Sequence, residues 1–201
     1  MVKADCGGCN GCSRCCHGMG NSIILDPYDV YRMTTGMGKS MQELLAASVE
    51  LNVVDGVILP NLKMQGTEEA CAYLDEEGRC SIHPYRPGIC RLFPLGRYYE
   101  NGGFSYFLQI GECAKENRSK IKVSKWIDTP DLTRNQQFTL QWHDLLHAME
   151  ERLTGEDEGK QREENLLLLR LFYLLPYEGT IDFYTQFTER MEHWNGQNGQ
   201  I

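Results

Sequence analysis

Nine cysteines occur among the 201 residues, and five of them crowd into the segment from Cys6 to Cys16. This segment reads CGGCNGCSRCC, and it has almost no apolar residue that could pack into a core. Thiolates two residues apart can wrap one soft metal centre, because the intervening pair forms a tight turn around it. The segment therefore predicts metal ligands rather than ordinary buried thiols.

Two overlapping cysteine spacings fit this segment. One is the C-x2-C-x2-C-x3-C spacing of bacterial ferredoxins, formed by Cys6, Cys9, Cys12 and Cys16. The other is C-x2-C-x2-C-C, formed by Cys9, Cys12, Cys15 and Cys16. The ferredoxin match is incomplete, because His17 stands where a proline usually follows the last cysteine.

Four more cysteines lie downstream in a distinctive layout. They occur in CAYLDEEGRCSI, in YRPGICRLFP and in GECAKENRSK, at Cys71, Cys80, Cys90 and Cys113. With the segment of residues 9–16, this order resembles the CxxCxxCC family, described as zinc- or iron-chelating and also called the YkgJ-type cysteine-cluster family. The resemblance covers about residues 9–120 and implies that the metal ligands are Cys9, Cys12, Cys15, Cys16, Cys71, Cys80, Cys90 and Cys113. Cys6 lies outside the family pattern.

Eight thiolates permit several metal centres. They would fill two four-thiolate sites, holding [4Fe–4S] clusters, zinc ions or one of each, or they would form one polynuclear site. Neighbouring side chains diverge, so Cys15 and Cys16 are expected to enter two sites, or one of them is not a ligand. We favour an iron–sulfur cluster over zinc, because ligands from scattered segments are less typical of compact zinc knuckles.

Three classes of function fit these cysteines. The first is a metal-binding protein that transfers electrons or senses redox state, and another is a structural zinc module for protein–protein contacts. The resemblance adds a third, a SAM-linked protein methyltransferase, because some proteins with this cysteine layout methylate lysines of flagellin. No SAM-binding loop is recognisable in the sequence. We expect an unidentified protein or redox partner.

Charge and hydropathy exclude other classes of partner. The formal net charge is -8 and no run of clustered Lys and Arg is present, so binding to nucleic acid is not expected. The longest apolar stretch, Leu166 to Leu175, is interrupted by Arg170 and is too short to span a bilayer. The charged start MVKADC has no apolar segment after it, so no secretory signal is expected. We expect a cytoplasmic protein whose odd number of cysteines stays reduced.

Two further groups of residues could support a metal site. Arg86 and Arg91 flank Cys90, where they would offset thiolate charge, although Arg86 would equally pair with a surface carboxylate. His143 and His147 are four residues apart on a predicted helix, a spacing that can hold a metal. Because no third ligand is evident, we interpret them as a surface pair.

Two helix signals follow the cysteine segment. Asp26 has the character of an N-cap and predicts a helix over residues 28–35, which the glycines at 36 and 38 should break. Ser40 and Glu43 form a capping box and predict a second helix to about Leu51.

Short strands and then long helices are expected in the rest of the chain. The strand-like runs are Val57–Leu59, Cys71–Leu74, Arg79–Ile82 and Phe104–Ile110. A turn over residues 75–78 should fold Cys80 back towards Cys71. After about residue 121, apolar residues recur at helical spacing, and further helices are expected over about 160–175 and 181–194.

These elements predict an α+β fold that is mostly helical, with a small irregular β region and a Gly/Cys-rich metal-binding loop. The predicted organisation is a cysteine-cluster metal-binding domain over residues 1–120. A helical extension over residues 121–201 is expected to pack on it.

Overall fold

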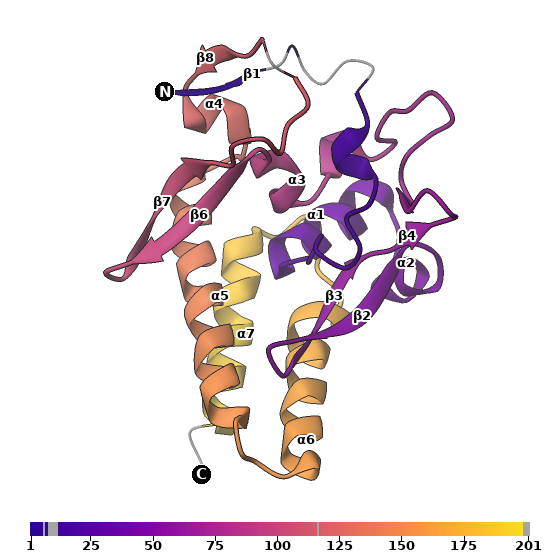
Figure 1. Cartoon of the computed structure of the whole chain (residues 1–201). Coiled ribbons are helices and arrows are strands. Elements are labelled where there is room, and N and C mark those ends of the chain that lie inside the picture. Colours follow the sequence, from indigo (N-terminus) through magenta and orange to yellow (C-terminus); the bar gives the residue numbers. More distant parts are fainter. Residues whose placement is uncertain (6, 8–11, 116, 199–201) are drawn as a thin grey trace.

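The structure, a computed structural model, describes residues 1–5, 7, 12–115 and 117–198, and it confirms the predicted α+β class (Figure 1). The α-helices are α1 (Pro27–Met37), α2 (Met41–Ala47), α3 (Gly88–Leu92), α4 (Val123–Ile127), α5 (Leu132–Leu153), α6 (Glu158–Leu169) and α7 (Phe183–Asn198). Short helical segments of other types are η1 (Arg14–Cys16), η2 (His83–Tyr85) and η3 (Arg170–Leu174). The strands are β1 (Val2–Asp5), β2 (Val49–Val54), β3 (Val57–Leu62), β4 (Met64–Gln65), β5 (Ala70–Cys71), β6 (Leu95–Glu100), β7 (Gly103–Leu108) and β8 (Ser119–Ile121).

The strands form two-stranded antiparallel sheets, in which β1 pairs with β8, β2 with β3, β4 with β5, and β6 with β7. In the longest two pairs, Val49 lies opposite Leu62 and Leu95 lies opposite Leu108. A two-stranded ribbon is marginally stable alone, so these ribbons depend on the helices against which they pack. The irregular β region is therefore a set of two-stranded ribbons on a helical frame (Figure 1).

The first helix begins as predicted. Asp26 accepts a hydrogen bond from the Asp29 amide at 2.8 Å, and the Asp29 carboxylate accepts one from the Asp26 amide at 3.2 Å. This reciprocal capping box satisfies amides that have no partner inside the helix. The helix ends two residues later than predicted. Gly36 is still helical, and Gly38 ends the helix with φ 65°.

The second helix is shorter than predicted. Its capping box between Ser40 and Glu43 is confirmed, but α2 ends at Ala47, and the predicted continuation to Leu51 is wrong. The chain instead forms the β2–β3 hairpin, with φ of 50° at Asp55 and 82° at Gly56 in its turn. An Asp-Gly pair between β-branched residues is the strongest short-range signal for such a hairpin, and it overrides the helical start.

The C-terminal helices follow the predicted apolar spacing. Phe138, Trp142, Leu145 and Met149 are all buried along α5. The helix predicted over 160–175 is α6 followed by η3, a π-helical segment that ends before Pro176. The last helix, α7, starts at residue 183 rather than 181.

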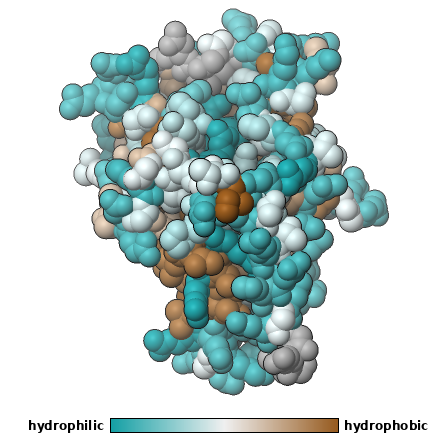
Figure 2. All heavy atoms as spheres, turned by 180° about the vertical axis from the view of Figure 1, so that it is seen from behind, coloured by the Kyte–Doolittle hydropathy of each residue, from teal (hydrophilic) through white to brown (hydrophobic). Residues whose placement is uncertain are grey.

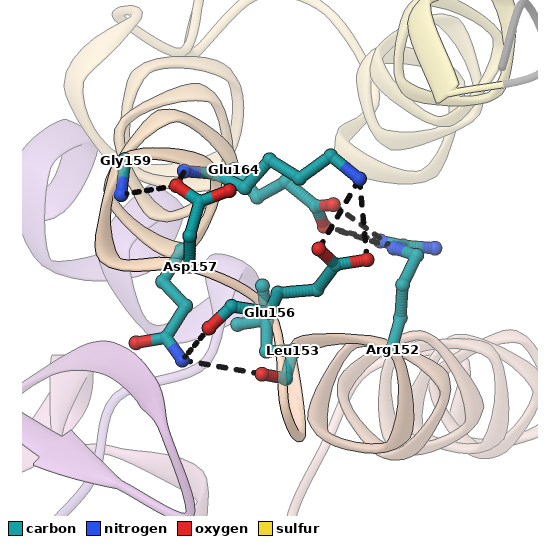
Figure 3. Close-up of polar contacts among 8 residues, drawn as sticks. Arg152, Leu153, Glu156, Asp157, Gly159 and Glu164 are labelled. Carbon is teal, nitrogen blue, oxygen red and sulfur yellow. Dashed lines mark hydrogen bonds and ion pairs between the residues drawn. The ribbon is translucent and has the colours of Figure 1, made fainter.

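Polar contacts hold the turn between α5 and α6 (Figure 3). Asp157 caps α6 by accepting hydrogen bonds from the amides of Gly159 at 2.8 Å and Lys160 at 3.1 Å. Arg152 of α5 forms an ion pair with Glu164 of α6, with Nη2 and Oε2 2.7 Å apart. These contacts fix the antiparallel approach of the two helices.

One buried apolar cluster joins the N-terminal and C-terminal parts of the chain. It contains Leu25 and Met33 from the first part and Phe138, Phe172 and Phe187 from the second. Residues of α5, η3 and α7 therefore form one side of a shared core, while a domain division near residue 120 stays a prediction. No helix within the described residues has the length and apolar character that crossing a membrane requires. The rear face is mostly hydrophilic, with hydrophobic side chains gathered in its lower half (Figure 2).

Candidate metal centre

A tight turn returns the chain from Cys71 to Cys80, as the sequence predicts. Asp75 Oδ1 accepts hydrogen bonds from the amides of Glu77 at 3.0 Å and Arg79 at 2.7 Å, and Leu74 forms an antiparallel bridge with Cys80. The flanking runs are less regular than predicted. Of the two predicted strands, only residue 71 lies in one, because the side chain of Asp75 takes backbone donors that a ladder would otherwise use.

The N-terminal loop is tied to the strand that carries Cys71. Cys15 and Cys16 lie in the single turn η1. Directly after it, His17 forms an antiparallel bridge with Ala70, and the Gly18 amide donates to the Glu69 carbonyl at 3.0 Å. Backbone pairing therefore places the cysteines of η1 beside β5.

Cys90 is positioned by the short helix α3. The Gly88 amide donates to Asp29 Oδ1 at 2.6 Å, which links the start of α3 to α1. At the other end of α3, Trp126 Nε1 donates to the carbonyls of Leu92 at 3.2 Å and Phe93 at 3.1 Å. A five-residue helix has little stability of its own, so these outside contacts fix the position of Cys90.

The three segments meet around one cavity of about 1100 Å³. Six of the eight predicted ligands line it, namely Cys12, Cys15, Cys16, Cys71, Cys80 and Cys90. Cys113 is described but lies outside the lining, although its neighbour Glu112 belongs to it. Cys9 and Cys6 lie outside the described residues. The structure thus brings together cysteines that are far apart in sequence, and their role as metal ligands stays a prediction.

The cysteines are close enough to perturb each other's protonation. Cys16 donates a hydrogen bond to the Cys15 sulfur, which lowers the pKa of Cys15 to about 6 and raises the pKa of Cys16. Burial raises the pKa values of Cys71, Cys80 and Cys90, and the charge of neighbouring thiolates raises them further. The cavity therefore disfavours several thiolates at the same time, and a bound cation would relieve the repulsion between them.

The cysteine thiols are suitable ligands for a thiophilic metal, but the described side chains do not converge on one point. Thiolates are the ligands that zinc and iron–sulfur clusters share. In the described ranges, no three His, Cys, Asp or Glu side chains are grouped as they would be around a metal ion. The side chains would therefore have to draw together, or join with residues beyond those described, to bind a single ion.

The two arginines beside Cys90 have different roles. Arg86 contacts Nε2 of His83, and its charge contributes to the lowered pKa of Cys15. Arg91 instead forms a buried ion pair with Asp29, with Nη2 and Oδ1 3.9 Å apart. Arg86 therefore stabilises the thiolate form of a cysteine through its charge, while Arg91 supports the helix that carries Cys90.

Sequence reasoning missed several residues of the cavity. The sequence predicts His143 as half of a surface pair, but its ring stacks on Tyr99 with centroids 3.8 Å apart and it lines the cavity. Arg97 and the buried Asp29 also line it. Arg97 and Tyr99 are two residues apart in β6 and therefore lie on the same face of the strand. This spacing alone does not indicate a cavity.

Comparison with known proteins agrees with the cysteine layout. The model of the CxxCxxCC family, described as a "putative zinc- or iron-chelating domain", matches residues 8–120, which is more than half of the chain. No curated protein and no solved structure is significantly similar to the chain. The match spans every predicted ligand from Cys9 to Cys113. The chain therefore belongs to the CxxCxxCC family.

Proposed function

We propose that this protein holds an iron–sulfur cluster through its cysteine thiolates and uses it for electron transfer or redox sensing. The observation that supports the proposal is the cavity shared by six cysteines from three separate segments of the chain. Membership of a metal-chelating family supports metal binding in general. The remaining predicted ligands, Cys9 and Cys113, are part of the proposal.

The arrangement of the thiols favours a cluster over a single zinc ion. A structural zinc site needs four ligands at about 2.3 Å from one point, with no open position. The described side chains are not grouped in that way, although six thiols face one cavity. A cluster of several irons and sulfides spreads its thiolate ligands over a larger volume, so scattered thiols suit it better.

The residues around the thiols would tune such a cluster. Arg86 lies close enough to lower the pKa of Cys15, so its charge would offset the negative charge of thiolate ligands. Cys71, Cys80 and Cys90 pack against the hydrophobic core, which would limit water at the sulfurs. When bound, the cluster would supply one-electron chemistry, and an unidentified redox partner would exchange the electron. The proposal includes a cytoplasmic location, where thiols stay reduced.

Anaerobic purification followed by iron, acid-labile sulfide and zinc analysis tests this proposal. We expect iron and sulfide in equal amounts and a visible absorption band that a reductant bleaches. The matched control is the same preparation of a Cys71→Ser, Cys90→Ser double variant, which should lose both iron and sulfide. Stoichiometric zinc without sulfide would contradict the cluster and leave the structural zinc module as the better function.

A further inference from the structure

The cavity extends well beyond the cysteines. Away from the thiols, its lining is mostly apolar and rich in aromatic rings. The apolar side chains come from β6, β7, α4 and α5: Leu95, Phe107, Trp126, Trp142 and Leu146. We call this part of the cavity the aromatic chamber. Ligand sites in proteins are typically cavities of about 300–1000 Å³ with apolar walls and a few polar groups, so the whole cavity is large enough for an organic molecule beside the thiols.

Contacts within the walls preform the aromatic chamber. Gly96 lies opposite Phe107 in the β6–β7 ribbon, and a Cβ atom at position 96 would come within 2.5 Å of the Phe107 ring. The phenyl ring therefore lies directly over the backbone of β6. Tyr99 stacks on His143, with an angle of 12° between the ring planes, and this contact fixes the ribbon to α5.

One cation in the lining, Arg97, forms no ion pair among the described residues. Arg97 of β6 is partly buried, its guanidinium lies 5.5 Å from the Phe104 ring centroid, and within the described residues its Nε has no hydrogen-bond partner. The carboxylate that feels its charge is Asp26, which already accepts a hydrogen bond from the Asp29 amide. Arg97 and Asp26 form no ion pair among the described residues, so the Nε donor of Arg97 stays available to a carboxylate from outside.

We propose that the aromatic chamber binds a small organic anion, an apolar carboxylate, beside the cysteine cluster. The carboxylate would pair with the guanidinium of Arg97, because a planar guanidinium and a carboxylate match in two parallel hydrogen bonds. The hydrocarbon would lie against Phe107 and Trp142. The proposal deepens the proposed function by naming a ligand class for the same cavity, but the binding site for the anion includes no thiol.

Calorimetric titration of the purified, metal-loaded protein with octanoate tests this inference. We expect one saturable site per chain, and we expect 1-octanol, which has the same chain length without charge, to bind more weakly. Arg97→Met keeps an unbranched side chain with an apolar stem and removes the charge, so it should weaken octanoate binding at least about tenfold. Arg97→Lys keeps the charge and should retain most of the affinity.

The matched control is Arg162→Met, which removes an exposed arginine of α6 that does not line the cavity and should leave octanoate binding unchanged. Equal binding of octanol and octanoate, no saturable site, or unchanged affinity in Arg97→Met would each overturn the proposal. Metal content is measured on every variant. Loss of octanoate binding with full metal content in Arg97→Met supports the chamber. Wild-type protein that contains no metal after anaerobic purification but binds octanoate would contradict only the proposed function.

Discussion

Asp29 and Arg91 form an ion pair inside the protein, with side chains that are only 2% and 5% exposed. The same Asp29 oxygen accepts the hydrogen bond from the Gly88 amide. Burial, followed by the charge of Asp26, raises the pKa of Asp29 to about 7, while Arg91 opposes that rise. The pair links α1 to α3, so the position of Cys90 depends on a carboxylate 61 residues earlier in the printed sequence.

Asp29→Ala should therefore destabilise the protein and loosen α3. The variant leaves the guanidinium of Arg91 buried without a counter-charge, which typically costs about 3–5 kcal/mol. The free energy of unfolding, measured by urea denaturation with circular dichroism, checks the prediction. The matched control is Glu156→Ala, which breaks an exposed ion pair with Lys160 and should cost no more than about 1 kcal/mol. Similar small losses in both variants would show that the buried pair is unimportant.

Gly36→Ala should destabilise the packing of α1 against η2, the short segment before Arg86 and Cys90. A Cβ atom at this helical position would lie 2.3 Å from the ring of Tyr85, which belongs to η2 just before Arg86. The ring must move, and overpacking of this kind typically costs about 1–3 kcal/mol.

Gly196→Ala is the matched control, because Gly196 lies in α7 with open space where its Cβ would be. There the higher helix propensity of alanine should raise the free energy of unfolding by up to about 1 kcal/mol. Thermal unfolding of both variants gives the comparison. A stabilising effect at both positions would mean that Tyr85 does not pack against Gly36.

Features set by local chemistry could be predicted from the sequence. The caps at Asp26 and Ser40 are formed by residues three positions apart, and the turn at Asp75 is closed by its own side chain. The β2–β3 hairpin also has a local signal, because Asp55-Gly56 stands between β-branched residues and so favours a shorter α2.

Features set by tertiary packing could not be predicted. Nothing around Asp29 indicates that its partners are Gly88 and Arg91, because an aspartate in the first turn of a helix is usually exposed. The contact between Tyr99 and His143 depends on how the β6–β7 ribbon packs on α5, which one sequence does not specify. The cysteine spacing indicated metal chemistry but gave no sign of the apolar cavity next to it.

Removal of metal should loosen the cysteine segments and leave the C-terminal helices intact. The predicted ligands come from distant segments, so metal bound to them would tie the N-terminal loop to the middle of the chain and contribute free energy of folding. Residues 1–20 and 70–113 should lose protection from hydrogen exchange in the chelated protein. Residues of α5 and α7 should keep it, because Phe138 and Phe187 belong to the shared core. Uniform protection before and after chelation would contradict the prediction.

Cys90→Ser should reduce metal content far more than Cys6→Ser. Cys90 lines the cavity, packs against the core and lies on a helix fixed at both ends, so its sulfur is preorganised as a ligand. Serine would leave that coordination position to a weaker oxygen. Cys6 lies outside the family match, which begins at residue 8, so its loss should be tolerated. The ferredoxin spacing predicts the opposite, because there Cys6 is the first ligand.

Metal per chain in each anaerobically purified variant is the readout, with circular dichroism as the control for folding. If Cys6→Ser loses as much metal as Cys90→Ser, the ferredoxin spacing describes the N-terminal ligands and the C-x2-C-x2-C-C assignment is wrong.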